Sequence, residues 1–401
     1  MSARALPIST SPIALLSRLL AKLDLTPTQR DDLKRSYGAV TEALLKSKTL
    51  EGILDKLELR PQGSVRAGTV VKPSPDVNFD LDVLCWMVFL RTGQTPAQVW
   101  KLIWDALGEH GTYASMREPK PRCIRLQFAA GYHLDITPAI PDPHRPAPVV
   151  WVPDTKLQAW SPSNPIGFCD SWLHVIAAQL PTTIVTFSAE SVLKGERAAA
   201  ASNRQDKVEP LPDEEGFRKA PLLKLIQLVK YFRDQAYEED DKDKPSSILL
   251  TTITARAYEK HLFSGHTSLN QFVVAVVSAI KAQVHVEYHH NTFKCSVMNP
   301  VDERENFADK WTLQTYSAFS RWADTLSSKM AAVMKSEAQG MDERLRVFNT
   351  SIPGAATFGI EKDIAADFRR HHDSGSLRLQ AVPAVATSLV GIRPTTFFGN
   401  P

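Results

Sequence analysis

The chain of 401 residues has no hydrophobic run long enough to cross a membrane, and its four cysteines form no CxxC pair. A membrane-spanning helix needs about 20 mostly apolar residues, so we expect none in this chain. Widely spaced cysteines are typical of reduced, mostly buried cytosolic thiols rather than of a disulfide framework. The sequence therefore predicts a soluble, cytoplasmic protein.

The sequence also lacks a strong excess of charge of either sign. Its 47 Lys and Arg residues stand against 44 Asp and Glu residues, which gives a formal net charge of +3. Proteins that bind nucleic acids usually carry a concentrated basic face, so this balance does not favour a nucleic-acid partner. The length exceeds what a single core usually organises, and we expect two domains or lobes with peripheral segments.

Two aspartates alternate within the otherwise apolar end of the segment Arg60–Met87. The side chains of a strand point alternately to its two faces, so Asp80 and Asp82 share one face and leave the other face to the core. Neighbouring carboxylates on a half-buried strand repel each other and lose hydration unless a cation lies between them. Mg²⁺ binds carboxylates and substrate phosphates, so the segment predicts magnesium chemistry on a nucleotide.

A third carboxylate lies on another predicted strand. Two alternating runs, Cys123–Phe128 and Tyr132–Thr137, flank the turn residues 129–131 and predict a β-hairpin. We expect Pro138 to end the second run. Asp135 within that run can then lie beside the first two aspartates in one sheet.

Most of the remaining chain is expected to be helical. Thr26 and Thr95 each precede a proline and stand three residues before a glutamine, the signature of a capping box. Residues 138–165 contain eight prolines and predict an extended excursion, and the last sixty residues lose clear periodicity. Helical periodicity or capping marks four further segments: Phe217–Tyr237, Ser247–Lys260, Ser268–Ile280 and Trp311–Lys335.

This order of motifs resembles the DNA polymerase β nucleotidyltransferase superfamily, whose Gly-Ser turn is matched by Gly63-Ser64. The resemblance implies that Asp80 and Asp82 bind two Mg²⁺ ions, for which Mn²⁺ can substitute. It also implies that Asp135 helps to bind one metal and positions the attacking 3′- or 2′-hydroxyl. The turn at Gly63 and Ser64 would lead a helix whose N-terminal amides hold the triphosphate.

Five segments in order narrow the resemblance to the bacterial cGAS/DncV-like nucleotidyltransferases, the cyclic-oligonucleotide synthases of CBASS anti-phage operons. The family uses a lysine and a serine of its helical lobe to hold the donor triphosphate, and the matching residues here are Lys230 and Ser247. Lys230 is expected at the rim of its helix face. A solvated Lys230 and a Ser247 that only caps its helix are the alternatives. The segments are GSVRAGTVVKP with DVNFDLDVL, HLDITPAIP, FRKAPLLKLIQLVKYFRD, PSSILLTTITARAY and NPVDERENFADKW.

The resemblance implies an α+β fold with a polymerase-β-like core of mixed sheet and helices, a helical lobe, and an active site in the cleft between them. We expect residues 1–205 to hold the N-terminal helices and the nucleotidyltransferase core. Residues 206–335 would form the helical lobe, and residues 336–401 a C-terminal segment and tail. The lobe boundary falls in the Glu/Lys/Arg/Ala-rich and polar stretch 186–210.

The implied activity joins two or three nucleoside triphosphates into a cyclic oligonucleotide messenger and releases pyrophosphate. ATP and GTP are the expected substrates and cyclic GMP-AMP the expected product, while bases, linkage and ring size stay open. The product would activate an effector encoded nearby. An RNA- or protein-modifying nucleotidyltransferase and a catalytically silent scaffold are the alternatives.

Two features stay outside this site. His285, His289, His290 and Cys295 invite a zinc interpretation, but a single cysteine without a CxxC pair favours a polar strand or surface turn. Without a zinc-binding insertion, activation by double-stranded DNA is not expected. The tail GIRPTTFFGNP resembles C-termini that a ubiquitin-transfer-like partner conjugates, although its Asn-Pro ending departs from that pattern; a disordered terminus is the alternative.

Overall fold

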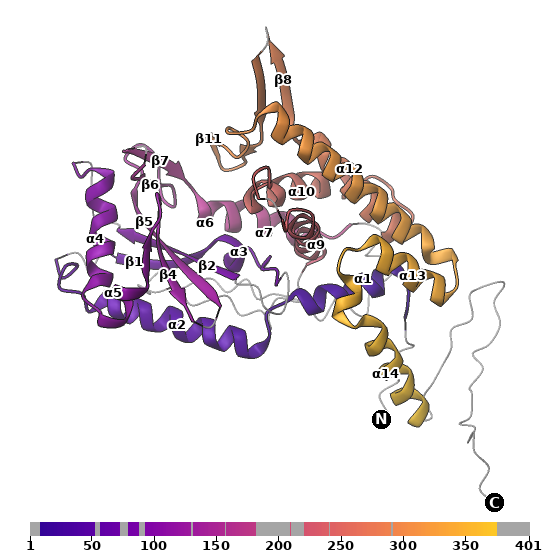
Figure 1. The fold of residues 1–401 in the computed structure, drawn as a ribbon. Helices are drawn as coiled ribbons and strands as arrows, with labels where there is room; N and C mark the ends of the chain where they lie inside the picture. The colour runs from indigo at the N-terminus through magenta and orange to yellow at the C-terminus, as the bar shows by residue number, and fades with distance from the viewer. Residues whose placement is uncertain are drawn as a thin grey trace, which may run out of the picture. The chain divides into compact units, whose positions relative to one another are not determined.

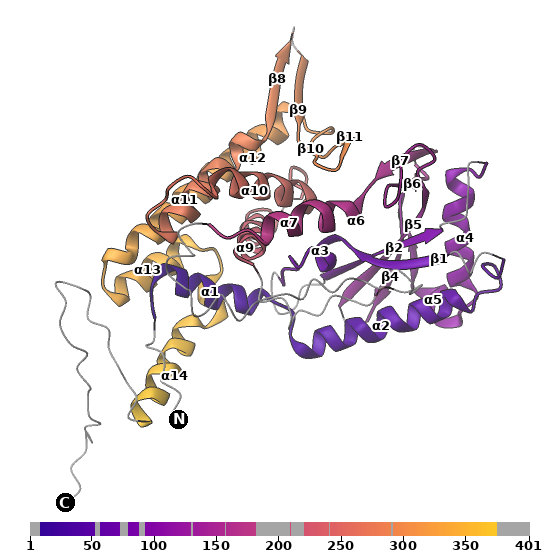
Figure 2. The ribbon, with the colours of Figure 1, turned by 180° about the vertical axis from the view of Figure 1, so that it is seen from behind.

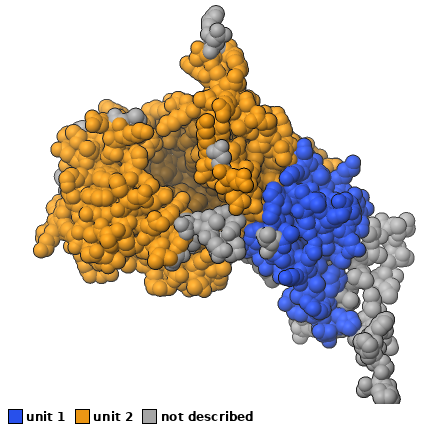
Figure 3. Space-filling model, viewed as in Figure 1, with its two compact units in different colours: residues 1–22, 328–401 blue, residues 23–327 orange. Residues whose placement is uncertain are grey.

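Two compact units make up the chain, one from residues 1–22 and 328–401 and the other from residues 23–327 (Figure 3). We call them unit 1 and unit 2. The predicted boundary at residue 205 and the predicted conjugation tail lie outside the described residues. The computed structural model describes residues 9–52, 57–72, 79–87, 93–129, 131–156, 158–181, 209, 220–239, 241–289 and 292–374.

Unit 1 combines most of helix α1 (Pro12–Leu23) with C-terminal helices, a grouping that the predicted three-part division did not contain. Arg18 of α1 pairs with Asp367 at 2.6 Å, which ties the two ends of the chain together. The described part of the C-terminal segment, which has no clear periodicity in the sequence, contains helices α13 (Met341–Ser351) and α14 (Ile360–Asp373). Both helices are rich in charged residues, and each buries a few apolar side chains, among them Phe348 of α13 and Ile364 of α14.

Unit 2 is built on a seven-stranded mixed sheet, drawn from indigo to magenta in Figures 1 and 2. The central strands β2 and β5 run parallel, and the other pairs are antiparallel. In spatial order the strands are β1 (Leu57–Gln62), β2 (Phe79–Met87), β5 (Tyr132–Pro141), β4 (Ile124–Phe128) and β3 (Arg117–Pro119), with β6 (Val150–Asp154) on β5 and β7 (Ala159–Ser163) on β6.

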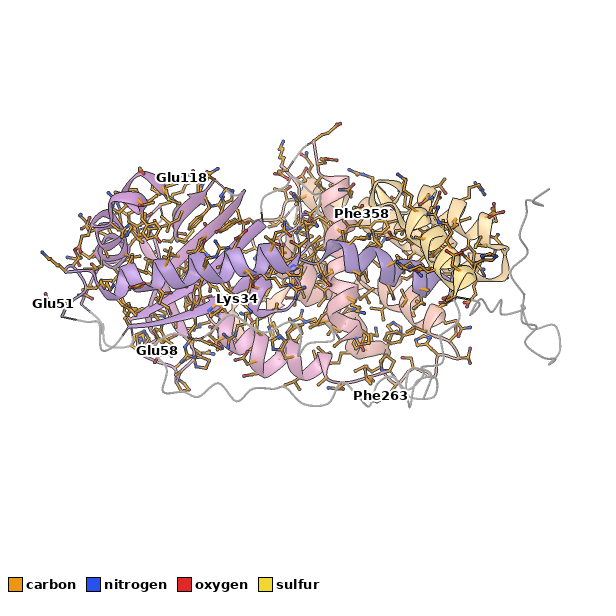
Figure 4. All side chains as sticks on the ribbon, turned by 90° about the horizontal axis from the view of Figure 1, so that it is seen from below. Lys34, Glu51, Glu58, Glu118, Phe263 and Phe358 are labelled. Atoms are coloured by element: carbon orange, nitrogen blue, oxygen red, sulfur yellow. The ribbon has the colours of Figure 1, made fainter. Side chains whose placement is uncertain are left out.

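One face of the sheet packs against helices α2 (Pro27–Leu45) and α4 (Pro96–Gly108). Both helices begin at the predicted capping boxes, with Thr26 and Thr95 as the N-caps. Lys34 lies on the exposed side of α2, which Figure 4 shows from below. The predicted core face of β2 is confirmed, because its members are buried in this layer: Leu81, Val83, Cys85 and Met87.

Strand β5 continues through Pro138 to Pro141, so the prediction that Pro138 ends the strand is wrong. Proline has no N–H to donate, but β4 pairs with β5 only as far as Ile136, which leaves that edge of β5 free at Pro138. The proline-rich residues 138–165 are not a simple excursion either. They form the hairpin β6–β7, which pairs with the end of β5 from Ile140 onward.

The predicted helices beyond the sheet are confirmed within the described residues, and residues 217–219 of the first lie outside them. Every helix in the described part of the chain is too short or too polar to cross a bilayer. The helices are α9 (Pro221–Ala236), α10 (Ser247–His261), α11 (Leu269–Ala279) and α12 (Leu313–Lys335); the short ones are α3 (Gly63–Arg66), α5 (Gly111–Met116), α6 (Pro165–Gly167) and α7 (His174–Ala177), with a π-helical stretch at Phe168–Leu173.

Two hairpins lie between α11 and α12. One joins β8 (His285–His289) to β9 (Thr292–Ser296), and the other joins β10 (Met298–Asn299) to β11 (Asp302–Asn306). The prediction of a polar strand at the histidines is therefore confirmed by β8. His285 contacts Glu287 at 3.0 Å, and His290 lies outside the described residues.

Candidate active site

Four neighbouring strands of unit 2 place polar side chains in one row. Gln62 of β1 lies opposite Asp82 of β2, and Asp82 lies opposite Asp135 of β5. On the other side of β5, Asp135 lies opposite Arg125 of β4. Residues opposite one another in a sheet point to the same face, so the structure brings the predicted third aspartate directly beside the second.

Asp80 precedes Asp82 by two residues and therefore lies on the same face of β2. Its side chain is 54% exposed. Burial raises the pKa of Asp80, Arg125 opposes that rise, and Asp135 adds to it. Burial raises the pKa of Asp82 to about 7, and the neighbouring carboxylates of Asp135 and Asp80 add to the effect. Burial and the mutual repulsion of the three carboxylates both disfavour their charged forms, so a bound cation would stabilise them.

Arg125 holds the third carboxylate in a bidentate pair. Its Nε donates to Oδ1 of Asp135 at 2.8 Å, and its Nη2 donates to Oδ2 at 2.7 Å. The same Nη2 lies 3.8 Å from Oδ1 of Asp80. Arg125 is a site residue that the sequence analysis missed; its one signal is its place on the polar face of the alternating run Cys123–Phe128.

The predicted Gly-Ser turn lies against Asp82. Strand β1 passes directly into α3, and Gly63 adopts a left-handed φ of +61° there. A Cβ atom on Gly63 would lie 2.0 Å from Oδ2 of Asp82, closer than any real Cβ contact. Only glycine therefore permits this approach, and the prediction that the turn leads a helix is confirmed by the single turn of α3.

Lys230 of α9 is only 4% exposed, so both its predicted place at the rim and the solvated alternative are wrong. The reason is that α9 is buried almost all round from Leu222 to Arg233. The Lys230 Nζ donates to Oγ1 of Thr69 at 2.8 Å, and the Thr69 N–H donates to the Ser64 carbonyl at 2.9 Å. These two bonds tie Lys230 to the Gly-Ser turn, and burial lowers the pKa of Lys230 to about 7.

Ser247 is the first residue of α10, and its side chain is exposed. The helix is capped by Ser246, whose Oγ accepts from the Leu249 N–H at 3.4 Å, so the alternative of Ser247 as the cap is wrong. The Ser247 Oγ accepts from Nη1 of Arg233 at 3.0 Å. Arg233 lies one helical turn beyond Lys230 on α9, so Ser247 contacts the same helix that carries Lys230.

Figure 3 shows a hollow in the surface of unit 2, between the part that carries the sheet and the part that carries the helices. No group of three His, Cys, Asp or Glu side chains among the described residues stands ready to hold a metal. Arg125 donates to both oxygens of Asp135, and the carboxylate oxygens of Asp80 and Asp82 are donors of the kind that a hard divalent cation prefers.

Comparison with known proteins agrees with this geometry. Residues 12–174 match the Second Messenger Oligonucleotide or Dinucleotide Synthetase domain. Over 398 residues the chain is 27% identical to the c-di-GMP synthase of Roseivirga ehrenbergii, with 96% of each chain covered. Residues 12–174 thus resemble a second-messenger synthetase domain, and the chain over most of its length is similar to a cyclic dinucleotide synthase.

Solved structures of CD-NTases share its fold. The Bradyrhizobium diazoefficiens CD-NTase CdnG in complex with GTP is 21% identical, with a TM-score of 0.63 over 90% of this chain and 99% of that one. The Escherichia coli DncV in its 3′-deoxy GTP bound form is 14% identical, with a TM-score of 0.54 over 84% of this chain and 95% of that one. The predicted α+β, polymerase-β-like fold class is confirmed.

Proposed function

We propose that this protein is a CD-NTase that joins ATP and GTP into a cyclic dinucleotide and releases pyrophosphate at each transfer. The observation that carries the proposal is the register that sets Asp82 beside Asp135, with Asp80 on the same face and the Gly63 turn against Asp82. Three carboxylates beside a helix N-terminus suit the binding and transfer of a nucleoside triphosphate.

In the first transfer, a hydroxyl oxygen of the acceptor forms a bond to the α-phosphorus of the donor, and pyrophosphate leaves with the electrons of the broken P–O bond. For this step Arg125 releases the Asp135 carboxylate. Asp135 then orients the acceptor hydroxyl and accepts its proton. Asp80 and Asp82 would hold Mg²⁺, or Mn²⁺ in its place, which when bound stabilises negative charge on the attacking and leaving oxygens.

The donor triphosphate is bound by residues of α3, α9 and α10. The N–H groups at the start of α3 and the buried Lys230 face the same turn, since Thr69 bridges Lys230 to Ser64. Ser247 and Arg233 extend this polar group along α9 and α10. After the first transfer, the linear intermediate turns over in the hollow of unit 2, and the same carboxylates serve the second transfer.

The resemblance in sequence favours cyclic GMP-AMP as the product, and the name of the Roseivirga relative makes cyclic di-GMP the second candidate. Incubation with Mg²⁺ or Mn²⁺ and labelled triphosphates, each omitted in turn, distinguishes them by mass spectrometry. We expect a phosphatase-resistant product that needs both ATP and GTP; a product from GTP alone selects cyclic di-GMP. A labelled polymer or a labelled protein would overturn the proposal.

The double variant Asp80→Asn with Asp82→Asn is the matched control. It removes two charges from a face where they repel each other, so we expect a folded protein without product. Product formation by this variant would refute the assignment of the site, and the silent-scaffold alternative requires that the wild type be equally inactive.

We further propose that the product activates a neighbouring effector in anti-phage CBASS signalling, and that a ubiquitin-transfer-like partner conjugates the C-terminus. Both proposals rest on the sequence resemblance. Mass spectrometry of the protein purified together with the products of its own operon tests the second: an unmodified Pro401 in every condition would refute it.

A further inference from the structure

Two buried aspartates and one arginine join the end of the catalytic strand to a distant hairpin. The Asp142 side chain, directly after β5, and the Asp302 side chain of β11 are both fully buried at 0% exposure. Arg304 of β11 contacts both of them: its Nη1 lies 2.8 Å from Oδ2 of Asp142, and its Nη2 lies 2.6 Å from Oδ2 of Asp302. We call these three residues the clasp.

The clasp holds charges that cannot easily separate. A buried carboxylate that loses its partner keeps the cost of desolvation without the compensating attraction, so breaking such a pair is far costlier than breaking a surface pair. Arg145 lies at the edge, 3.9 Å from both Asp302 and Glu303, where a pair contributes little. The shorter ion pair between the two segments is therefore the one from Asp142 to Arg304.

The hairpin β10–β11 contacts both the sheet part and the helices of unit 2. On the sheet side, β11 packs against β7, and Figures 1 and 2 both show the two strands side by side. Phe307, after β11, makes an edge contact with Phe168, which follows α6, at 6.2 Å between ring centroids. On the helix side, Nη2 of Arg256 in α10 donates to the Met298 carbonyl at 2.7 Å.

Through these contacts the clasp connects the two halves of the proposed site. Strand β5 carries Asp135 and ends just before Asp142, so the strand is a direct connection between them. Helix α10 begins at Ser247 and packs against α9, which carries Lys230. Further attachments of α9 lie at Lys230, which donates to Thr69, and at Gln227, whose Nε2 donates to the Val70 carbonyl at 2.6 Å.

We propose that the clasp fixes the spacing of the sheet and the helices so that the linear intermediate stays in the hollow until it has cyclised. Asp142 and Arg304 are then positioning residues, and this inference rests on the proposed cyclase function. The first transfer needs one donor aligned at Lys230 and the carboxylates, which the attachment at Thr69 preserves. The second transfer needs the intermediate to be retained while it turns, and a looser cleft releases it.

The test compares Asp142→Asn with Arg145→Gln, a matched loss of one charge from the same loop. The amide oxygen that Asp142→Asn introduces can still accept the His144 N–H, which now donates to Oδ1 of Asp142 at 2.8 Å, so the loop keeps its local support. Liquid chromatography with mass spectrometry gives the ratio of linear to cyclic product, and pyrophosphate release gives the rate of the first transfer. Circular dichroism checks the fold.

We expect Asp142→Asn to raise the linear share at least about fivefold, with pyrophosphate release within about twofold of wild type, while Arg145→Gln leaves both unchanged. Arg304→Lys keeps the positive charge but cannot contact Asp142 and Asp302 at once, so we expect a smaller rise in the linear share. This variant decides the test if Asp142→Asn fails to fold. An unchanged ratio of linear to cyclic product in folded Asp142→Asn overturns the proposed role of the clasp. An equal rise of the linear share in Arg145→Gln overturns it as well. A wild type that releases no pyrophosphate overturns the proposed function instead.

Discussion

Replacing Gly63 with alanine tests the contact between the Gly-Ser turn and Asp82. The added Cβ would lie 2.0 Å from Oδ2 and 2.8 Å from Cγ of Asp82, whereas carbon atoms in contact normally stay about 3.5 Å apart. Either the carboxylate rotates away or the turn moves back. In both cases the first helical turn and the carboxylate leave the arrangement that the proposed chemistry requires.

The magnitude follows from two separate effects. The left-handed backbone, with φ at +61°, costs an alanine about 1–2 kcal/mol, which we expect as a loss in the free energy of unfolding. Displacing a reacting group by about 1 Å lowers the rate of catalysis about 100-fold. We therefore expect Gly63→Ala to fold with modestly reduced stability and to release pyrophosphate about 100-fold more slowly than wild type.

Gly68→Ala is the control that separates these effects. Gly68 has nearly the same φ, +67°, but its added Cβ would meet only the flexible Leu223 side chain, at 3.3 Å. Denaturant unfolding should show a similar loss of stability in both variants, while Gly68→Ala keeps its activity within about threefold of wild type, since no reacting group moves. Equal activity of the two variants would refute the argument from Asp82.

Two other predictions concern charges in the site. Arg125→Gln frees both oxygens of Asp135 from a positive charge, so titration calorimetry without nucleotide should show Mn²⁺ binding tighter by at least about tenfold; unchanged affinity would contradict the competition. Burial lowers the pKa of Lys230 from 10.5 to about 7, so between these pH values the unfolded chain binds more protons than the folded one. The free energy of unfolding should therefore increase as pH rises from 7 to 10, because Lys230 is neutral in the folded protein but protonated in the unfolded chain. Urea unfolding of Lys230→Met should not show this increase.

Local patterns were sufficient for much of the fold. The capping boxes at Thr26 and Thr95 begin helices as predicted, because the bonds of a capping box join residues only three apart. The errors lie where distant contacts decide. Pro138 stays in its strand because β4 has already ended, and α14 is held to α1 by the ion pair of Asp367 with Arg18, a contact between opposite ends of the sequence.

The same division applies to the site. The alternation of side chains along a strand is a local property, so the sequence by itself determined that Asp80 and Asp82 share a polar face and that Gly63-Ser64 precedes them. Register between strands depends on pairing across long loops, and only the tertiary structure set Asp135 opposite Asp82 and Arg125 on Asp135. The burial of Lys230 and the clasp on Asp142 belong to the same class, because burial and ion pairing arise from packing between segments far apart in the chain.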